Sequence, residues 1–311
     1  MSYPITFRQL EIFAAVAKHL SFTRAAEELH LSQPAVSMQV KQMENLIKTV
    51  LIEKIGKHLF LTEAGRVALD YSEKILSSKL ALEETLCSLQ GAEKGHLRLA
   101  VPGTANQFMT LVLAEFIKIH PGITFDLHIH NRKGLLNSLK NNLADLVIMG
   151  KTPDNMELVT QAFMNNPLVV ITSPKHPLSN KKIIQLDQLM EIEFVVREHG
   201  SGTRNAMQKF FDQHNIQLKK SMEMPNNEAI KQAVAAGLGF GIVSLHTLQQ
   251  ELALKRLKVL SVEQMPIMRI WYLVHQKQKI VSPAMTLFMK FVLNNTQQIW
   301  GKAYPELLAH L

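Results

Sequence analysis

Residues 21–40 read SFTRAAEELHLSQPAVSMQV, and two short helical patterns meet within this stretch. Ser32 is a preferred N-cap, and a proline is tolerated just after it because the first N–H groups of a helix have no intrahelical partner. The sequence therefore predicts a helix over residues 33–47 that opens with small polar side chains. Its inner face carries four apolar residues, Val36, Val40, Met43 and Ile47. The opposite face, which begins at Gln33 and Ser37, can approach another polar surface closely.

Two more helices are predicted before this one, over residues 6–19 and 23–30, with Thr6 as the N-cap of the first. The expected apolar face of the first helix consists of Phe7, Leu10, Phe13, Ala14 and Ala17. Paired helices of this kind are typical of a helix-turn-helix, whose second helix enters the DNA major groove. An ordinary capped helix pair in a protein core has the same periodicity, so both interpretations stay open at this point.

The helix-turn-helix interpretation predicts a double-stranded DNA partner and assigns contacts by side-chain chemistry. Polar and thioether groups of the second helix can meet base edges, whereas cations and hydroxyls can meet phosphates. The candidates for base edges are Gln33, Ser37 and Met38, with Ser32 and Pro34 in the same first turn. The candidates for phosphates are Ser21, Thr23, Arg24 and Lys41.

A hairpin is predicted directly after this helix, in LIEKIGKHLFLT at residues 51–62. Two short β patterns flank Ile-Gly-Lys-His, with Gly56 at the turn. Beside a helix-turn-helix such a hairpin is a wing, and Lys54, Lys57 and His58 could touch the DNA backbone. A solvated turn is the alternative, and the sequence leaves both open.

A long helix capped by Thr62 is predicted next, running to about residue 90. Its two apolar stripes contain Ala68, Tyr71, Ile75, Leu82 and Leu89 on one side and Leu69, Leu76 and Leu80 on the other. An isolated helix cannot bury so much apolar surface, so we expect a homodimer through this linker helix. Cys87 is expected to pack in that interface, and GAEKG at 91–95 is expected to end the helix as a hinge.

Length and composition limit the class of protein. The 311 residues suit two or three domains, and 47% hydrophobic with 19% charged residues is typical of a globular chain. One cysteine fits a reducing cytosol, and neither a secretory signal nor a membrane-spanning stretch is predicted, so we expect a cytoplasmic protein. The net charge of +8 lies entirely in residues 93–311, since residues 1–92 hold ten basic and ten acidic residues. This charge therefore does not argue for DNA binding; it fits an anionic ligand or a solvated surface.

Strand and helix patterns alternate from residue 96 onwards, beginning with HLRLAVP at 96–102 and TANQFMTLVLAEFIKIHP after it. This βαβ alternation predicts an α/β fold with a parallel sheet. LVVITSP at 168–174 and FVVRE at 194–198 begin a second set. We therefore expect two α/β subdomains.

Ligands of such subdomains meet the carboxyl ends of strands and the amino ends of helices. The candidates there are Thr104, Ala105, Asn106, Asn131, Gly202, Thr203 and Arg204, with Asn227 and Ser244 as weaker ones. GSGTR at 200–204 exposes N–H groups at a helix start and adds an arginine, which favours a small anionic ligand. A plain left-handed turn with a helix cap would have the same sequence. Neither a cofactor nor a metal site is expected, because His128 and His130 lack a third ligand and nucleotide-binding or hydrolase motifs are missing from the sequence.

A resemblance to LysR-type transcriptional regulators is carried by FRQLEIFAAVAKHLSFTRAAEELHLSQPAVSMQVKQME, followed by LFLTEAG. Farther on, REHGSGTR, NNEAIKQAVAAGLGFGIVSLHTLQQEL and RIWYLVHQKQKIVSP resemble the RuBisCO-operon (CbbR/RbcR-like) branch of that family. Ser32, Gln33, Pro34 and Ser37 fall on the family's recognition-helix motif. Where the family usually has Gly, Pro and Phe, this chain has Lys48, Val50 and Ile52, which leaves the angle of the wing open.

The resemblance implies a domain order for the whole chain. It consists of a winged helix-turn-helix over 1–62, a linker helix over 63–92 and an effector domain over 93–311. The effector domain would resemble a type 2 periplasmic binding protein, with subdomain I at about 96–163 and 268–295 and subdomain II at about 164–267. The tail after residue 295 lies beyond the resemblance.

The resemblance also implies a function. It is that of a homotetrameric transcriptional activator that bends promoter DNA differently when it binds a phosphorylated metabolite or NADPH. RNA polymerase would be a further partner. In this branch the target would be carbon-fixation genes. A solute-binding protein or a small-molecule enzyme of the same α/β architecture is the alternative, although the sequence has neither a secretory signal nor a catalytic constellation.

Overall fold

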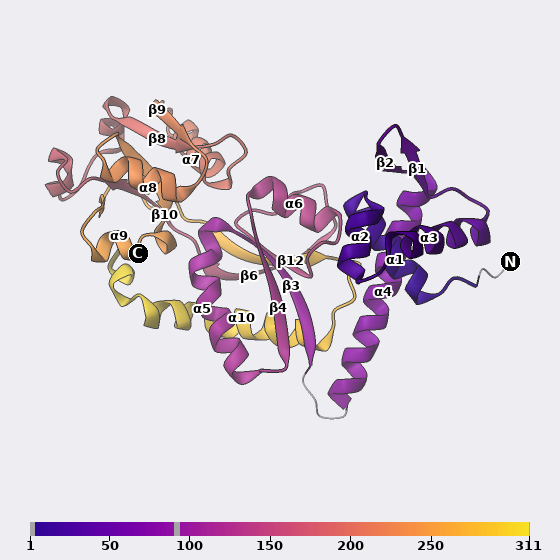
Figure 1. Cartoon of the computed structure of the whole chain (residues 1–311). Helices are drawn as coiled ribbons and strands as arrows, with labels where there is room; N and C mark the ends of the chain where they lie inside the picture. Colours follow the sequence, from indigo (N-terminus) through magenta and orange to yellow (C-terminus); the bar gives the residue numbers. More distant parts are fainter. Residues whose placement is uncertain (1–3, 90–93, 311) are drawn as a thin grey trace. The chain divides into compact units, whose positions relative to one another are not determined.

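The computed structural model describes residues 4–89 and 94–310, and the chain forms two compact units. The first contains the residues up to Gln90 together with Ile280–Ser282, and the second contains Gly91–Lys279 and Pro283–Leu311. Figure 1 shows the order of the elements along the chain. The hinge expected at GAEKG begins with residues 91–93, which lie outside the described residues.

Helices surround the core of the N-terminal unit. Its elements are α1 (Phe7–His19), α2 (Phe22–Leu29), α3 (Gln33–Ile47), β1 (Ile52–Ile55), β2 (His58–Leu61) and α4 (Glu63–Leu89). The predicted caps are confirmed, because Thr6 accepts from the N–H of Gln9 and Ser32 from that of Ala35. The side chains of Phe13, Ala25 and Val36 are fully buried where the first three helices meet.

The apolar faces expected for these helices are confirmed for most of their residues, although Ala14 is only partly buried. Val36, Val40 and Met43 of α3 are buried, as predicted. The prediction was wrong for Phe7, which is 51% exposed. Phe7 lies in the first turn of α1, and the buried face of that helix begins only at Gln9. Its ring lies 6.0 Å from the ammonium group of Lys79 on α4, so it packs at the surface.

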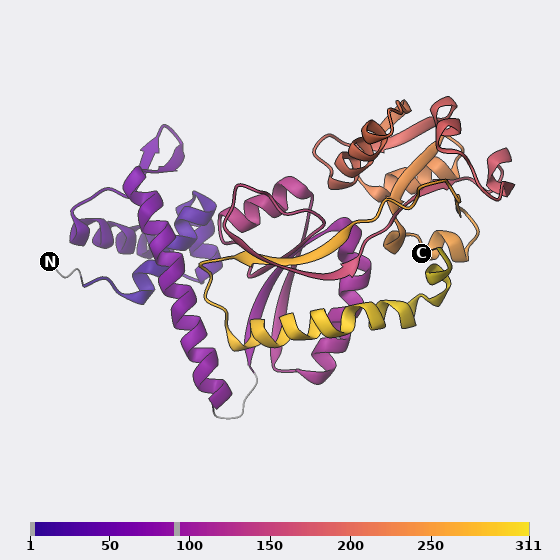
Figure 2. The ribbon, with the colours of Figure 1, turned by 180° about the vertical axis from the view of Figure 1, so that it is seen from behind.

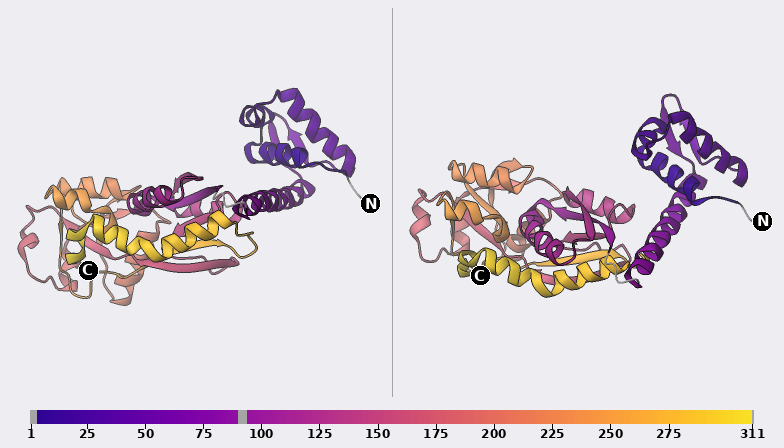
Figure 3. Two further views of the ribbon diagram at one scale, coloured as in Figure 1. Left: turned by 90° about the horizontal axis from the view of Figure 1, so that it is seen from below. Right: turned by 60° about the horizontal axis from the view of Figure 1, so that its bottom comes forward.

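The hairpin predicted at residues 51–62 is confirmed. Strands β1 and β2 pair antiparallel around Gly56, whose φ of +62° favours glycine. At its base, Oε1 of the buried Glu44 accepts hydrogen bonds from the N–H groups of Leu51 (2.8 Å) and Ile52 (3.2 Å). Thr62 then caps α4. The first half of this long helix packs against the N-terminal core, and its later turns extend beyond it (Figure 3).

The first sheet of the C-terminal unit is mixed. Its strands are β3 (Gly95–Pro102), β4 (Ile123–His130), β5 (Leu146–Met149), β6 (Leu158–Asn165) and β12 (Ile270–Gln276), in the order β4-β3-β5-β12-β6. The predicted parallel pairing holds for β3 with β4 and with β5. The direction of β12, which the sequence leaves open, is antiparallel to both β5 and β6. The start of β12 therefore lies at the same sheet edge as the end of β5.

Helices cover both faces of this sheet. These helices are α5 (Gly103–Ile119), α6 (Arg132–Lys140) and α10 (Pro283–Ala303). Leu99 and Val101 of β3 pack with α5 and α10, whereas Ala100 between them packs with α6. This alternation is the period-two pattern of a strand buried on both sides. Figure 2 shows α10, in yellow, running along the sheet.

The second sheet has the order β11-β7-β10-β8-β9. Its strands are β7 (Leu168–Thr172), β8 (Glu193–Arg197), β9 (Lys219–Met224), β10 (Phe240–Ser244) and β11 (Lys258–Val259). Its helices are α7 (Gly202–Gln213), α8 (Asn227–Ala235) and α9 (Gln249–Ala253), with short 3-10 turns η1 (Pro177–Asn180), η2 (Leu186–Glu191), η3 (Leu245–Thr247) and η4 (Pro305–His310). Phe211 of α7 packs on one face with Phe194, and Ile230 of α8 packs on the other. The segment LHTLQQELALKR contains only η3 followed by the short α9.

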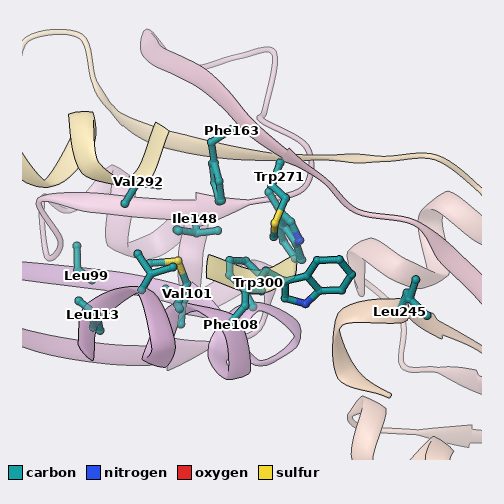
Figure 4. Packing of buried hydrophobic residues seen from close by; sticks show 14 of the residues in the cluster. Leu99, Val101, Phe108, Leu113, Ile148, Phe163, Leu245, Trp271, Val292 and Trp300 are labelled. Atoms are coloured by element: carbon teal, nitrogen blue, oxygen red, sulfur yellow. The ribbon is translucent and has the colours of Figure 1, made fainter. Parts of the chain in front are cut away.

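The C-terminal tail belongs to the core of this unit. Helix α10 runs past residue 295, and the side chains of Trp300, Tyr304 and Leu307 are buried in one cluster with Leu245 and residues of both sheets. Figure 4 shows Trp300 near Phe108 and Trp271. The tail, for which the sequence offered no role, therefore packs against both subdomains.

Candidate functional site

The outer face of α3 carries the side chains predicted to read DNA. A shallow depression there is lined by Gln33, Pro34, Ser37, Met38, Lys41, Gln42 and Asn45. Met38 is 55% exposed although it is apolar. Lys41 is also exposed, and its ammonium group lies 3.4 Å from Glu44. The described part of the N-terminal unit leaves this face open to a partner.

The remaining predicted DNA contacts are also at the surface of this unit. Ser21 caps α2 by accepting from the N–H of Arg24 at 3.3 Å, so its hydroxyl stands at a helix start. Thr23 and Arg24 are exposed in the first turn of α2. Lys54 and Lys57 are exposed on the hairpin, on either side of Gly56. These positions suit contacts to a phosphate backbone on both sides of α3.

A cavity of about 480 Å³ lies in the C-terminal unit, at strand ends of both sheets. Six predicted residues line it, namely Thr104, Asn106, Asn131, Gly202, Thr203 and Asn227. They belong to the first turns or N-caps of α5, α6, α7 and α8. The structure thus brings together residues that lie more than a hundred positions apart in the sequence, and their helix starts favour an anion.

Three predicted ligand residues lie outside this cavity lining. Ala105 is fully buried in the core behind Thr104. Ser244 is also buried, and its hydroxyl donates to Oδ1 of Asn166 at 2.8 Å. Arg204 points away from the cavity, because its guanidinium donates to the carbonyl of Arg197 and to the carboxylate of Glu223.

Four cationic side chains of the cavity were missed from the sequence, namely Arg132, Arg197, Lys231 and Arg269. Arg132 directly follows the predicted Asn131, and Arg197 lies near the end of the predicted strand FVVRE. Both could therefore have been predicted, because ligands bind at the carboxyl ends of strands. Arg269 precedes β12. Its position beside the end of β5 can be predicted only if β12 is known to run antiparallel to β5.

Two of these cations are neutralised by the protein. The guanidinium of Arg197 donates to both carboxylate oxygens of Glu198, at 2.7 and 2.9 Å, and to Oδ1 of Asn227. Lys231 is 7% exposed and lies 2.8 Å from Glu228 and 2.7 Å from Glu251. These groups shape the cavity wall and fix Asn227, but two cations with three carboxylates contribute no net positive charge.

The other two cations have no carboxylate partner within residues 4–89 and 94–310. The guanidinium of Arg132 donates to the carbonyl of Lys151 at 2.6 Å. Burial, and then the charge of Arg132, lowers the pKa of Arg269 to about 10, so Arg269 stays protonated at neutral pH. Two neighbouring positive charges partly removed from water attract an anion more strongly than exposed ones would.

Two buried polar atoms at the cavity also have no hydrogen-bond partner among the described residues. They are the hydroxyl of Ser201, whose residue is 2% exposed, and Nδ2 of Asn227, whose residue is 7% exposed. Leaving such a group unpaired typically costs about 1–3 kcal/mol. A ligand that accepts hydrogen bonds from both would recover this cost.

Metal sites and membrane-spanning helices are absent from the part of the chain that the structure describes. Groups of three or more metal-ligating side chains were not found among the described residues. His128 and His130 do stack, with ring centroids 6.1 Å apart, but a third ligand does not join them there. Within those residues, every helix is too short or too polar to cross a membrane.

A winged helix-turn-helix followed by a two-sheet α/β unit with a cationic cavity defines a ligand-responsive DNA-binding regulator. Residues 7–66 match the model of bacterial regulatory helix-turn-helix proteins of the lysR family, and residues 90–297 match the LysR substrate binding domain. The chain therefore belongs to the LysR family of transcriptional regulators, which confirms the resemblance seen in the sequence.

Several regulators of this family are similar to the chain over most of their length. It is 49% identical over 295 residues to the RuBisCO operon transcriptional regulator of Allochromatium vinosum, covering 95% of this chain and 98% of the relative. It is 44% identical to the transcriptional activator CmpR of Synechocystis, covering 94% and 97%. Among solved structures, the regulatory domain of Synechocystis CcmR in complex with 2-PG is 39% identical, with a TM-score of 0.63, over 66% of this chain and 98% of that one.

Proposed function

We propose that this regulator binds promoter DNA through α3 and changes that binding when a small phosphorylated acid occupies the cavity. The observation that carries the proposal is the pair Arg132 and Arg269, two cations that lack a carboxylate partner in the described structure. The CcmR regulatory domain, which is similar over the same region, binds 2-PG. A phosphomonoester with a carboxylate matches such a cavity in size and charge.

The relatives suggest the target. Regulators that are 44–49% identical over nearly the whole chain are named for the RuBisCO operon or as the activator CmpR. We infer that this chain activates carbon-fixation genes and acts in the cytoplasm as a regulator, not as an enzyme. Contact with RNA polymerase at the promoter is part of this proposal.

The linker helix α4 supports a homodimer. Its described side chains include several large apolar residues that are 41–60% exposed in a single chain, namely Val67, Tyr71, Ile75, Leu80, Leu82 and Leu86. Exposed apolar surface on so long a helix is stabilised by a second copy of the same helix. Two such dimers would form the homotetramer expected of the family.

The effector response is tested by a gel shift and footprint of the full-length protein on DNA upstream of a carboxylase operon. The ligand to add is 2-phosphoglycolate, a phosphomonoester that carries a carboxylate. We expect it to change the footprint, because a bound ligand favours one arrangement of the two subdomains. Thr104→Val removes a hydroxyl at the cavity and should weaken the response. Thr110→Val, on the exposed side of the same helix, is the matched control and should respond as the wild type does. A footprint that ignores the ligand at saturating concentration would refute this effector class.

A further inference from the structure

The guanidinium of Arg269 lies in a space that depends on a glycine. A Cβ atom added to Gly150, directly after β5, would lie 2.9 Å from Cζ of Arg269 and closer still to Nη2. Real Cβ atoms do not approach other atoms so closely, so one of the two groups would have to move. Arg269 can occupy its position only because residue 150 has no side chain.

The same guanidinium also faces the second subdomain. A Cβ added to Gly202, in the first turn of α7, would lie 3.5 Å from Nη2 and 3.9 Å from Nη1, which is ordinary van der Waals contact. Arg269 therefore lies between the end of β5 and the start of α7. A ligand bound to it contacts groups of both sheets.

The charges of the cavity specify the ligand's anionic group. Glu198 neutralises Arg197, and Glu228 and Glu251 together exceed the single charge of Lys231. Among the described residues, Arg132 and Arg269 are therefore the two cavity cations without a carboxylate partner. Two positive charges are matched by a dianion, and a planar guanidinium binds two oxygens of a phosphate at once. A monocarboxylate would leave one of the two charges unpaired.

Two buried polar atoms that have no partner among the described residues indicate where the other end of the ligand binds. The hydroxyl of Ser201 and the amide of Asn227 are buried hydrogen-bond donors at the starts of α7 and α8. Neutral donors at helix starts suit a carboxylate, whose single charge needs no arginine.

We propose that Arg269, with Arg132, is the specificity-determining receptor for a dianionic phosphomonoester group, and that Gly150 is required to keep the guanidinium in place. The carboxylate of the same ligand binds at Ser201 and Asn227. This inference rests on the proposed function in its choice of cavity, and adds which end of the effector is selected and by which residues.

Gly150→Ala is the decisive variant. The clash falls on the far end of a flexible side chain, so the protein should fold with Arg269 displaced. Thr110→Val is the control, since Thr110 lies on the exposed side of α5 and outside the cavity lining. Arg269→Gln removes the charge itself.

The experiment is calorimetry of the full-length protein with inorganic phosphate, 2-phosphoglycolate and glycolate, beside thermal unfolding of each variant. Wild type and Thr110→Val should bind 2-phosphoglycolate with similar affinity and glycolate far more weakly. Gly150→Ala and Arg269→Gln should each lose about tenfold or more for 2-phosphoglycolate and for phosphate, the effect of losing charged hydrogen bonds. Their unfolding temperatures should stay close to that of the wild type.

Three results would overturn the inference. One is wild-type affinity for 2-phosphoglycolate in Gly150→Ala or Arg269→Gln, which would leave the proposed function intact. Another is an equal loss for glycolate and 2-phosphoglycolate, which would indicate general damage to the cavity. The third is a wild type that binds neither phosphate nor 2-phosphoglycolate; the gel shift on promoter DNA would then decide separately whether the regulator assignment stands.

Discussion

The indole Nε1 of Trp271 donates a hydrogen bond to Nδ1 of His246 at 3.2 Å. Trp271 lines the cavity of the C-terminal unit, and His246 lies in η3 directly after β10 of the second sheet. Beside it, the hydroxyl of Ser244 donates to Asn166, which connects β6 with β7. Polar contacts thus run from the cavity wall to a connection between the two sheets, so occupancy of the cavity has a physical route to their arrangement.

The first prediction is that mild acid destabilises the C-terminal unit through His246. This residue is 2% exposed, and burial lowers its pKa from 6.5 to about 4. Above pH 6.5 the imidazole is neutral in both states and contributes no pH dependence. Between pH 6.5 and 4 the unfolded chain takes up a proton that the folded chain does not, so stability falls by about 3 kcal/mol in total.

Urea unfolding at several pH values measures this effect. His246→Gln keeps an acceptor for the indole of Trp271 and should flatten the fall between pH 6.5 and 4. His128→Gln, which changes an exposed histidine of β4, should leave the wild-type slope unchanged. An unaltered slope in His246→Gln would assign the acid sensitivity to another group.

The second prediction concerns the tail. Trp300 is 3% exposed, and its ring meets that of His246 edge-on with centroids 4.6 Å apart. Trp300→Ala should therefore destabilise the protein by about 3–5 kcal/mol, as large-to-small changes in cores do. Gln298→Ala, on the exposed side of the same helix, should change stability by no more than about 0.5 kcal/mol. Equal unfolding midpoints for the two variants would show that the tail does not contribute to the core.

The tail and β12 show where sequence reasoning reached its limit. The N-terminal unit could be predicted almost element by element, because caps such as Thr6 and Ser32 and the stripe of α3 are local signals. The antiparallel direction of β12 depends on partners more than a hundred residues away, and IWYLVHQ has the same apolar pattern in either direction. The burial of Trp300 likewise depends on His246 and Phe108, not on its neighbours in sequence.

The residues of the candidate site also separate into those with a local sequence signal and those whose position depends on distant parts of the chain. Thr104, Asn131 and Thr203 were found because helix starts after strands are visible in sequence. Arg269 was missed because its place in the cavity follows from the direction of β12. The prediction for Arg204 rests on its position after Gly-Ser-Gly-Thr. One residue along a helix turns a side chain by about 100°, and this rotation directs Arg204 to Glu223.

The third prediction separates base readout from backbone contact on α3. Gln33 and Ser37 carry no positive charge, so the double variant Gln33→Ala/Ser37→Ala should lose preference for the promoter sequence while remaining dimeric. Lys41→Ala should weaken binding to every sequence and reduce the slope of log K against log salt by about 1. Fluorescence anisotropy on promoter and scrambled duplexes measures both. Retained promoter preference in the double variant would move base readout away from this face.

The fourth prediction concerns Lys48, which stands where the family usually has glycine. Lys48 ends α3 with φ of +55°, a left-handed conformation that costs a residue with Cβ about 1–2 kcal/mol. Glycine removes this cost but loses about 0.5–1 kcal/mol through the entropy of the unfolded chain. Lys48→Gly should therefore stabilise the N-terminal unit by about 0.5–1 kcal/mol.

Lys48→Ala is the control for this change, because it removes the charged side chain and keeps the Cβ that causes the strain. It should give no gain in the urea midpoint. The wing should keep its position in both variants, since Glu44 holds Leu51 and Ile52 through their N–H groups independently of residue 48. A stabilised Lys48→Gly with unchanged promoter affinity would show that the departure from glycine costs stability without setting the wing; reduced affinity would instead show that Lys48 itself takes part in DNA binding.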